Sequence, residues 1–209
     1  MGSRERRARE REETRERILE AARKMFVRHG YEATTMRAIA DKIEYTPTAI
    51  YHHFRNKDAL LTELASSDFR ALAAAFQKIG RIEDPIERLS RVGDAYVQFA
   101  LEHPMQYQLM FMTQKPEGVI ANSLMHGDPT QDAYAFLREA CAGAIASGRL
   151  RADVKDADEL AQMLWSSTHG ILALQMMKKG GPIPWRDARK TARRISETMM
   201  RGLLRDSTK

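Results

Sequence analysis

The chain has 209 residues, of which 43% are hydrophobic, and carries a formal net charge of +6 at pH 7. This composition excludes a disordered chain, and the single cysteine, Cys141, excludes an intramolecular disulfide framework and a cysteine-based zinc site. No apolar run approaches the ~18 residues of a membrane span, and no hydrophobic segment follows the charged N-terminus, so we expect a cytoplasmic protein with no membrane contact.

Apolar residues recur at helical spacing along almost the whole chain, and proline and glycine separate the periodic segments. Signals for strands are nearly absent. We therefore predict an all-α fold with about nine helices. From periodicity and from start and stop signals, the expected helices span about residues 12–29, 36–44, 47–53, 57–79, 85–103, 104–112, 130–147, 156–179 and 186–205.

A run of alternating charges, RERRAREREETRER, precedes the first expected helix. Pairs such as Glu5 with Arg9 and Glu13 with Arg17 favour a solvated, partly helical extension. The run also fits an arm that contacts nucleic-acid phosphates or enters a minor groove. Residues 1–60 hold fourteen Lys and Arg against ten Asp and Glu, a net charge of +4, which suits a polyanionic partner.

Residues 35 to 54 are predicted to form two short helices joined by a tight turn. The first helix, with Thr34 or Thr35 as its N-cap, carries an apolar stripe of Met36, Ile39, Ala40 and Ile43. Thr46 and Pro47 give the second start signal, a hydroxyl N-cap followed by proline at the first helical position. Two short helices with such a turn are the helix-turn-helix pattern, whose second helix enters the major groove of DNA.

The residues of this region also resemble a known family. The strings GYxxTTxRxIA and TPTAIYHHFRNKDALL, between Gly30 and Leu61, resemble the DNA-binding domain of the TetR family of transcriptional regulators. The resemblance implies an arm and helix-turn-helix domain over residues 1–56, joined by a long helix to a ligand-binding and dimerisation domain over residues 57–209. One departure is Glu44, which stands in the turn where the family usually has glycine. Either Glu44 adopts a left-handed conformation, at a cost on the order of 1 kcal/mol, or the turn is reshaped.

The resemblance also implies which side chains contact DNA. Phosphate contacts are implied for Thr35, Tyr51, His53 and Lys57. Contacts in the groove are implied for Arg37, Pro47, Thr48 and His52, and we add Thr46 at the start of the second helix. Arg37 can pair bidentately with guanine O6 and N7, although it also fits an exposed position on a solvated helix face. Tyr51 could instead pack against the first helix.

Two matches in the second half are shorter. The string WSSTHG at 165–170 resembles the W-H-G signature of one TetR C-terminal subgroup, and HPMQYQLMF at 103–111 is similar to its preceding helix. Trp165 and His169 share one helix face, and aromatic and methionine side chains of neighbouring helices are typical of a small-molecule pocket. The predicted effector site consists of Tyr96, Phe99, Tyr107, Met110, Phe111, Trp165, His169 and Leu172. The alternative is that this face is ordinary core with His169 hydrogen-bonded inside.

The last two expected helices each carry an apolar stripe. Such a pair suits a four-helix bundle between two subunits, although packing within one chain could also cover either stripe. The resemblance favours a two-fold homodimer. The predicted dimer interface consists of Leu164, Ile171, Leu174, Ala192, Ile195, Met199 and Leu203.

Motifs of catalysis are missing from the sequence: we find no glycine-rich phosphate loop, no GxSxG and no HExxH, and the six histidines have no metal-ligand spacing. We expect no enzyme, no cofactor and no metal. The predicted function is that of a homodimeric regulator, most simply a repressor, that binds a palindromic double-stranded operator and responds to a small molecule. A DNA-binding architectural dimer without a ligand and a helical small-molecule carrier are the alternatives.

Overall fold

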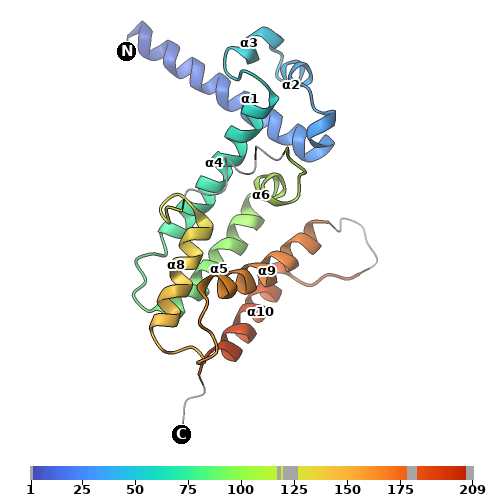
Figure 1. The fold of residues 1–209 in the computed structure, drawn as a ribbon. Coiled ribbons are helices and arrows are strands. Elements are labelled where there is room, and N and C mark those ends of the chain that lie inside the picture. The colour runs from blue at the N-terminus through green and yellow to red at the C-terminus, as the bar shows by residue number, and fades with distance from the viewer. Residues whose placement is uncertain (1, 117–118, 120–126, 178–182, 206–209) are drawn as a thin grey trace. The chain divides into compact units, whose positions relative to one another are not determined.

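The computed structural model describes residues 2–116, 119, 127–177 and 183–205 (Figure 1). Within this part of the chain the structure has helices and no extended strand, which confirms the predicted all-α class. The nine helices are α1 (Ser3–Ala33), α2 (Met36–Lys42), α3 (Pro47–Tyr51), α4 (Lys57–Gln77), α5 (Pro85–Glu102), α6 (Pro104–Phe111), α8 (Ala133–Ala146), α9 (Ala157–Met176) and α10 (Ala188–Leu203).

Aspartate side chains begin most of the later helices. Asp84, Asp132, Asp156 and Asp187 are the N-caps of α5, α8, α9 and α10, and each carboxylate accepts a hydrogen bond from a backbone N–H of the first turn. These bonds satisfy amide groups that have no partner inside the helix, and the negative charge suits the positive end of the helix dipole. The helix starts are therefore fixed by local sequence.

The first helix is longer than the sequence indicated. It begins at Ser3 instead of about residue 12, and it continues to Ala33 through a kink at Gly30, where φ is 80°. The charged extension is thus helical, with ion pairs such as Arg6 to Glu10 at 3.6 Å. Gly30 does not end the helix but bends it, because glycine accepts a positive φ at little cost.

The described chain forms two compact units. Unit 1 contains the chain up to Asp68 and the described part of 105–125, whereas unit 2 contains Phe69–Pro104 and the described part of 126–209. The division therefore lies inside α4 and gives most of α6 to unit 1, unlike the boundary after residue 56 that we expected from the sequence.

Each unit has its own apolar core. In unit 1, buried residues of α1 to α4 and Phe54 pack together with Leu109 of α6 and with Val119. In unit 2, α5, α8, α9 and α10 pack against one another, and the rings of Phe76 and Phe136 lie 5.8 Å apart. Cys141 is buried in α8, and burial raises the pKa of its thiol to about 12, which agrees with an inert side chain. None of the described helices has the length and apolar character that crossing a membrane requires.

Candidate functional site

The helix-turn-helix of unit 1 is built by caps and a small core. Thr35 accepts a hydrogen bond from the amide of Ala38 at 3.1 Å, and Thr46 accepts one from the amide of Ala49 at 3.3 Å. Behind these helices, the apolar side chains of Met36, Ile39, Ala40, Ile50 and Phe54 are buried. The buried faces fix α2 and α3 against α1, so the opposite faces are left for contact with a partner.

The turn between α2 and α3 keeps its tight form without glycine. Glu44 has a φ of 61°, in the left-handed region, and the amide of Tyr45 donates to the carbonyl of Ala40 at 3.0 Å. Of the two possibilities that the sequence left, the structure therefore has the left-handed Glu44. The conformation costs about 1 to 2 kcal/mol for a residue with a Cβ.

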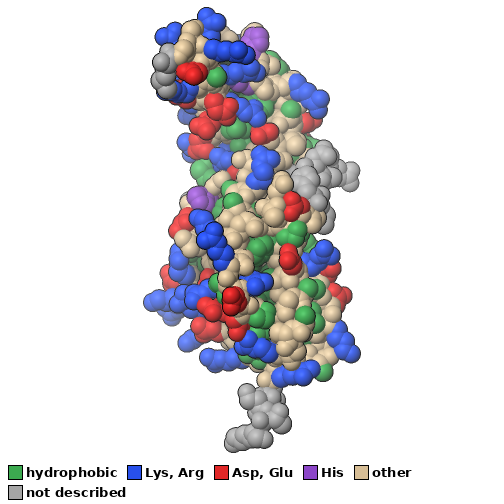
Figure 2. Space-filling model, turned by 90° about the vertical axis from the view of Figure 1, so that its left-hand side faces the viewer, with side chains coloured by type: hydrophobic (Ala, Val, Ile, Leu, Met, Phe, Trp, Pro, Cys, Tyr) green, Lys and Arg blue, Asp and Glu red, His purple; other side chains and the backbone are tan. Residues whose placement is uncertain are grey.

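The side chains predicted to contact DNA lie mainly on the exposed faces of α2 and α3. Exposed side chains are those of Thr35, Arg37, Thr46, Thr48, Tyr51 and His52, whereas Pro47, His53 and Lys57 are half-buried. Tyr51 is 52% exposed, so its ring is not packed away against α1. The surface view shows Lys and Arg side chains gathered beside histidine on the part of unit 1 that carries α1 to α3 (Figure 2).

The helical extension of α1 brings further cations to His53. A surface hollow of about 530 Å³ is lined by Arg7, Ala8, Arg11, Glu12, Arg15 and His53. Burial lowers the pKa of His53, and the positive charges of Arg11 and Arg15 lower it further. A group whose charged form is disfavoured by neighbouring cations reports a positive local potential, which favours an anion such as a phosphate.

Lys57 is already engaged within unit 1. Its ammonium donates to the carbonyl of Tyr31 at 2.8 Å and lies 3.9 Å from the centre of the Tyr31 ring. Tyr31 in turn donates to Asp58, and burial together with this carboxylate raises the pKa of Tyr31 to about 12. Lys57 therefore joins the end of α1 to the start of α4, a role that the sequence did not indicate.

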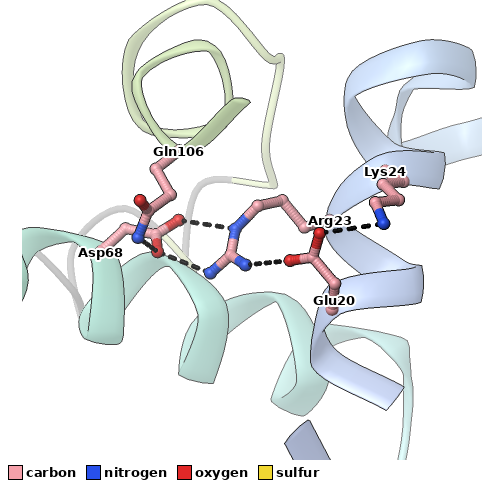
Figure 3. A network of polar contacts seen from close by, with 5 residues as sticks. All are labelled: Glu20, Arg23, Lys24, Asp68 and Gln106. Atoms are coloured by element: carbon pink, nitrogen blue, oxygen red, sulfur yellow. Dashed lines mark hydrogen bonds and ion pairs between the residues drawn. The ribbon is translucent and has the colours of Figure 1, made fainter. Parts of the chain in front are cut away.

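A polar network that the sequence analysis missed joins α1, α4 and α6 inside unit 1 (Figure 3). Arg23 donates to Asp68 at 2.7 Å and 3.4 Å, and Gln106 donates to the same carboxylate at 2.9 Å. Arg23 also pairs with Glu20 at 2.8 Å, which pairs with Lys24 at 3.2 Å. The Asp68 side chain is completely buried, and burial raises its pKa although Arg23 and Gln106 act in the opposite direction.

Lys115 follows α6 and holds its C-terminal end. Its ammonium donates to the carbonyls of Met110 at 2.8 Å and Thr113 at 3.2 Å. Burial lowers the pKa of Lys115 to about 8, and the negative charge of Asp68 partly opposes this shift. The group is thus still largely protonated at neutral pH, where its charge complements the carbonyls at the end of the helix.

The residues of the predicted effector site are divided between the two units. Tyr107, Met110 and Phe111 belong to unit 1, where the rings of Tyr107 and Phe111 lie 5.1 Å apart. The other five, which belong to unit 2, are Tyr96, Phe99, Trp165, His169 and Leu172.

Three of the unit 2 residues form a hydrogen-bonded group, which we call the aromatic cluster: Tyr96, Trp165 and His169. The indole of Trp165 donates to the hydroxyl of Tyr96 at 3.0 Å, and this hydroxyl lies 2.8 Å from Nδ1 of His169. Burial lowers the pKa of His169, so its neutral form is favoured and its Nδ1 can accept a hydrogen bond from the hydroxyl of Tyr96. The ring of Tyr134 lies 6.2 Å from that of Trp165.

The predicted dimer residues differ in exposure. Leu174 of α9 is 47% exposed and Met163 of the same helix is 43% exposed, whereas Leu164 and Ile171 are half-buried. In α10, Ile195 and Met199 are half-buried. Ala192 and Leu203 are buried within their own chain, at 2% and 8% exposure, so the inward side of the α10 stripe packs against unit 2 itself.

Two family models match the chain. The model described as bacterial regulatory proteins, tetR family, matches residues 18–64, and that described as tetracyclin repressor-like, C-terminal domain, matches residues 89–199. The first match contains the helix-turn-helix and the second contains most of unit 2. The chain belongs to the TetR family of bacterial regulatory proteins.

Individual relatives agree with this family. An HTH-type transcriptional repressor of Mycobacterium tuberculosis is 41% identical over 68 residues, 32% of this chain and 36% of the relative. The HTH-type transcriptional repressor AcnR of Corynebacterium diphtheriae is 38% identical over 69 residues, 33% of this chain and 36% of the relative. The chain thus matches about a third of the length of these relatives. The crystal structure of the TetR-family regulator PfmR of Thermus thermophilus has a TM-score of 0.67 at 27% identity, covering 90% of this chain and 99% of that one.

Proposed function

We propose that this protein is a homodimeric repressor that binds a palindromic operator through α2 and α3 and is released by a small hydrophobic or amphipathic effector. The observation that carries the proposal is the exposed polar face of the helix-turn-helix, with Arg37, Thr48 and His52 on it. Regulators of this family bind DNA and function as dimers, and the two curated relatives are repressors by name. Binding to the bacterial chromosome would place the protein in the cytoplasm.

Within this proposal, each α3 enters a major groove, and the half-sites are separated by about one helical turn, roughly 34 to 36 Å. Phosphate contacts come from Thr35, Tyr51, His53 and Lys57, and the ammonium of Lys57 is held by the carbonyl of Tyr31. The cations of Arg7 and Arg11 add further positive potential on the same side of His53. Base contacts come from Arg37, Thr48 and His52, whose donors fit base edges.

The dimer would use the exposed and half-exposed apolar side chains of α9 and α10. Leu164, Ile171 and Leu174 lie on one stripe of α9, and Ile195 and Met199 lie on α10. Two such helices from each subunit form a four-helix bundle whose two-fold axis matches that of a palindrome.

Effector binding is assigned to the aromatic cluster and its apolar neighbours. The resemblance of Trp165, His169 and Gly170 to the W-H-G subgroup supports this assignment, as does the mixture of aromatic rings with few polar groups. Release would follow from differential affinity. An effector that prefers a conformation with wrongly spaced recognition helices lowers the affinity for the operator, and the operator lowers the affinity for the effector by the same factor.

A second candidate function is an architectural DNA-binding dimer without an effector. The hydrogen bonds that Tyr96, Trp165 and His169 make to one another favour it, because they are what a filled core also requires. A melting-temperature screen with small hydrophobic and amphipathic compounds separates the two functions, since only a ligand site gives concentration-dependent stabilisation.

DNA binding itself is tested with genomic fragments selected by the purified protein. We expect a specific duplex whose affinity falls steeply with salt, because cations on the protein release counterions from DNA, and sedimentation as a dimer at micromolar concentration. A monomer that retards no genomic fragment would contradict the proposal.

A further inference from the structure

A cavity in unit 2 is lined by none of the residues of the aromatic cluster. It has a volume of about 360 Å³ and is lined by α5, α9, α10 and the segment that follows α4. Its floor is apolar and buried: Ile79, Val97 and Ala192 are 9%, 5% and 2% exposed. Cavities of small-molecule sites have about 300 to 1,000 Å³, so this one suits a small ligand.

The rim of this cavity is strongly basic. Lys78, Arg91, Arg189 and Arg193 line it, against the single acidic residue Asp94. Arg91 forms ion pairs with Glu87 at 3.4 Å and with Asp94 at 3.7 Å. The other three cations have no carboxylate within ion-pair distance among the described residues, and all three side chains are exposed.

These unpaired cations come from parts of the chain that are more than a hundred residues apart. Lys78 follows α4, whereas Arg189 and Arg193 lie one turn apart on α10 and so project from the same face. Asp94 is the single acidic residue of the lining and is paired with Arg91, so the three other positive charges concentrate a positive potential in the cavity.

We propose that this cavity binds a small organic anion that has a phosphate or carboxylate head and a short apolar group. Guanidinium groups pair bidentately with both heads, and the hydroxyl of Ser196 supplies a further donor at the cavity wall. The apolar group would cover Ile79 and Val97. The site is separate from the DNA surface and from the aromatic cluster, so it goes beyond the function proposed above.

Gly93 contributes space to this site. A Cβ built at Gly93 would have only the Ser196 hydroxyl within 4 Å, at 3.7 Å, and no positive φ is required there. A larger side chain at position 93 would therefore be tolerated by the α5 backbone and would occupy the space beside Ser196. This gives a steric probe of the cavity that leaves every charge in place.

The test is direct binding to the full-length protein, without DNA, by isothermal titration calorimetry. The probes are octyl phosphate, octanoate, octanol and inorganic phosphate, each below the concentration at which micelles form. We expect at least one of the two amphiphilic anions to bind about 10-fold more tightly than inorganic phosphate and than octanol. Preference for one anion identifies the head group. Octanol binding as tightly as the anions, or no binding by either anion, would overturn the proposal.

Charge and steric variants locate the binding. The double variant Arg189→Gln/Arg193→Gln should weaken the anion about 10-fold or more, and Gly93→Leu should weaken it similarly. The matched control is Arg194→Gln/Arg201→Gln, which removes the same charge from the exposed face of α10 outside the cavity. Equal loss in both double variants, or wild-type affinity in Arg189→Gln/Arg193→Gln, would place the anion elsewhere. Because DNA is absent, these results stand whether or not the proposed operator binding does.

Discussion

The helix-turn-helix surface and the aromatic cluster differ in how their polar groups are used. On α2 and α3, the side chains of Arg37, Thr48 and His52 are exposed and make no side-chain hydrogen bond to another described residue. In the aromatic cluster, the polar atoms of Tyr96, Trp165 and His169 bond to one another. The first surface therefore has donors available for a partner, whereas a ligand at the second must compete with bonds that already exist.

The two units also differ in the polar groups that they bury. In unit 1, a fully buried carboxylate, Asp68, is balanced by an arginine and an amide from two other helices. In unit 2, the buried polar group is the imidazole of His169, whose neutral form is favoured, so its burial costs little free energy. Substitutions in unit 1 should consequently have the larger effect on stability.

The largest effect is expected for Arg23→Ala. It leaves Asp68 buried without its cation, and breaking a buried pair from one side costs about 3 to 5 kcal/mol. Urea unfolding of the variant measures this loss. Lys24→Ala is the control, because Lys24 lies on the same helix but its pair with Glu20 is about half exposed on both sides and should contribute less than about 1 kcal/mol.

A third variant separates the charge from the packing. In Arg23→Ala/Asp68→Asn the buried group is neutral and can still bond to Gln106, so much of the lost stability should return. If Arg23→Ala cost no more than Lys24→Ala, the buried pair would not be what holds α6 against α1 and α4.

The next largest effect is expected at the subunit interface. Leu174→Arg places a charge on the exposed apolar stripe of α9 and should weaken dimerisation by about 30-fold or more, equivalent to ~2 kcal/mol. Analytical ultracentrifugation over a range of concentrations measures the dissociation constant. Leu101→Arg, at an exposed leucine of α5, is the matched control and should leave the dimer intact. Dissociation by the control alone would move the interface to α5.

At the DNA surface, Arg37→Ala and Arg11→Ala should fail in different ways. Loss of a bidentate base contact costs about 1 to 3 kcal/mol and relaxes specificity at one base pair. Loss of the positive charge of Arg11, which lies beside His53, should weaken specific and scrambled duplexes alike and reduce the salt slope by about one. Fluorescence anisotropy with both duplexes at several salt concentrations distinguishes them. Equal losses on both duplexes for Arg37→Ala would reassign Arg37 to the backbone.

Sequence alone predicted what depends on neighbours along the chain. The apolar stripe of α2 and the cap at Thr46 are local patterns that the structure has as expected, and of the two caps that sequence allowed for α2 the structure has Thr35. The left-handed Glu44 was one of two forms that sequence allowed. The run before residue 12 has no apolar periodicity, so sequence indicated only a partly helical extension, whereas in the structure it is helical from Ser3 and carries an exposed ion pair between Arg6 and Glu10.

What sequence could not predict depends on residues far apart in the chain. Arg23 and Asp68 are 45 positions apart, and nothing near either residue indicates the other. An apolar stripe also does not say what covers it: Ala192 and Leu203 were assigned to the dimer, but both are buried in their own subunit. Sequence likewise cannot assign the predicted effector residues to a pocket, since aromatic side chains fill a core as well as they line a pocket.

The smallest effect is expected at His169, and it tests whether the aromatic cluster is a core or an effector site. Burial lowers its pKa below the usual value of about 6.5, so the unfolded state binds the proton more readily than the folded state. The stability that the neutral form supports is present above about pH 6.5 and is lost as the pH falls from there toward the lower pKa of the folded protein. Chemical unfolding between pH 5 and pH 8 should show this decrease, and His169→Gln should reduce it, because glutamine does not titrate.

The same variant distinguishes core from effector site. If the aromatic cluster binds an effector, His169→Gln should require more ligand for release of DNA, while the DNA affinity without ligand changes little. If the cluster is only core, the variant should change the pH dependence of stability and nothing in the response to ligands.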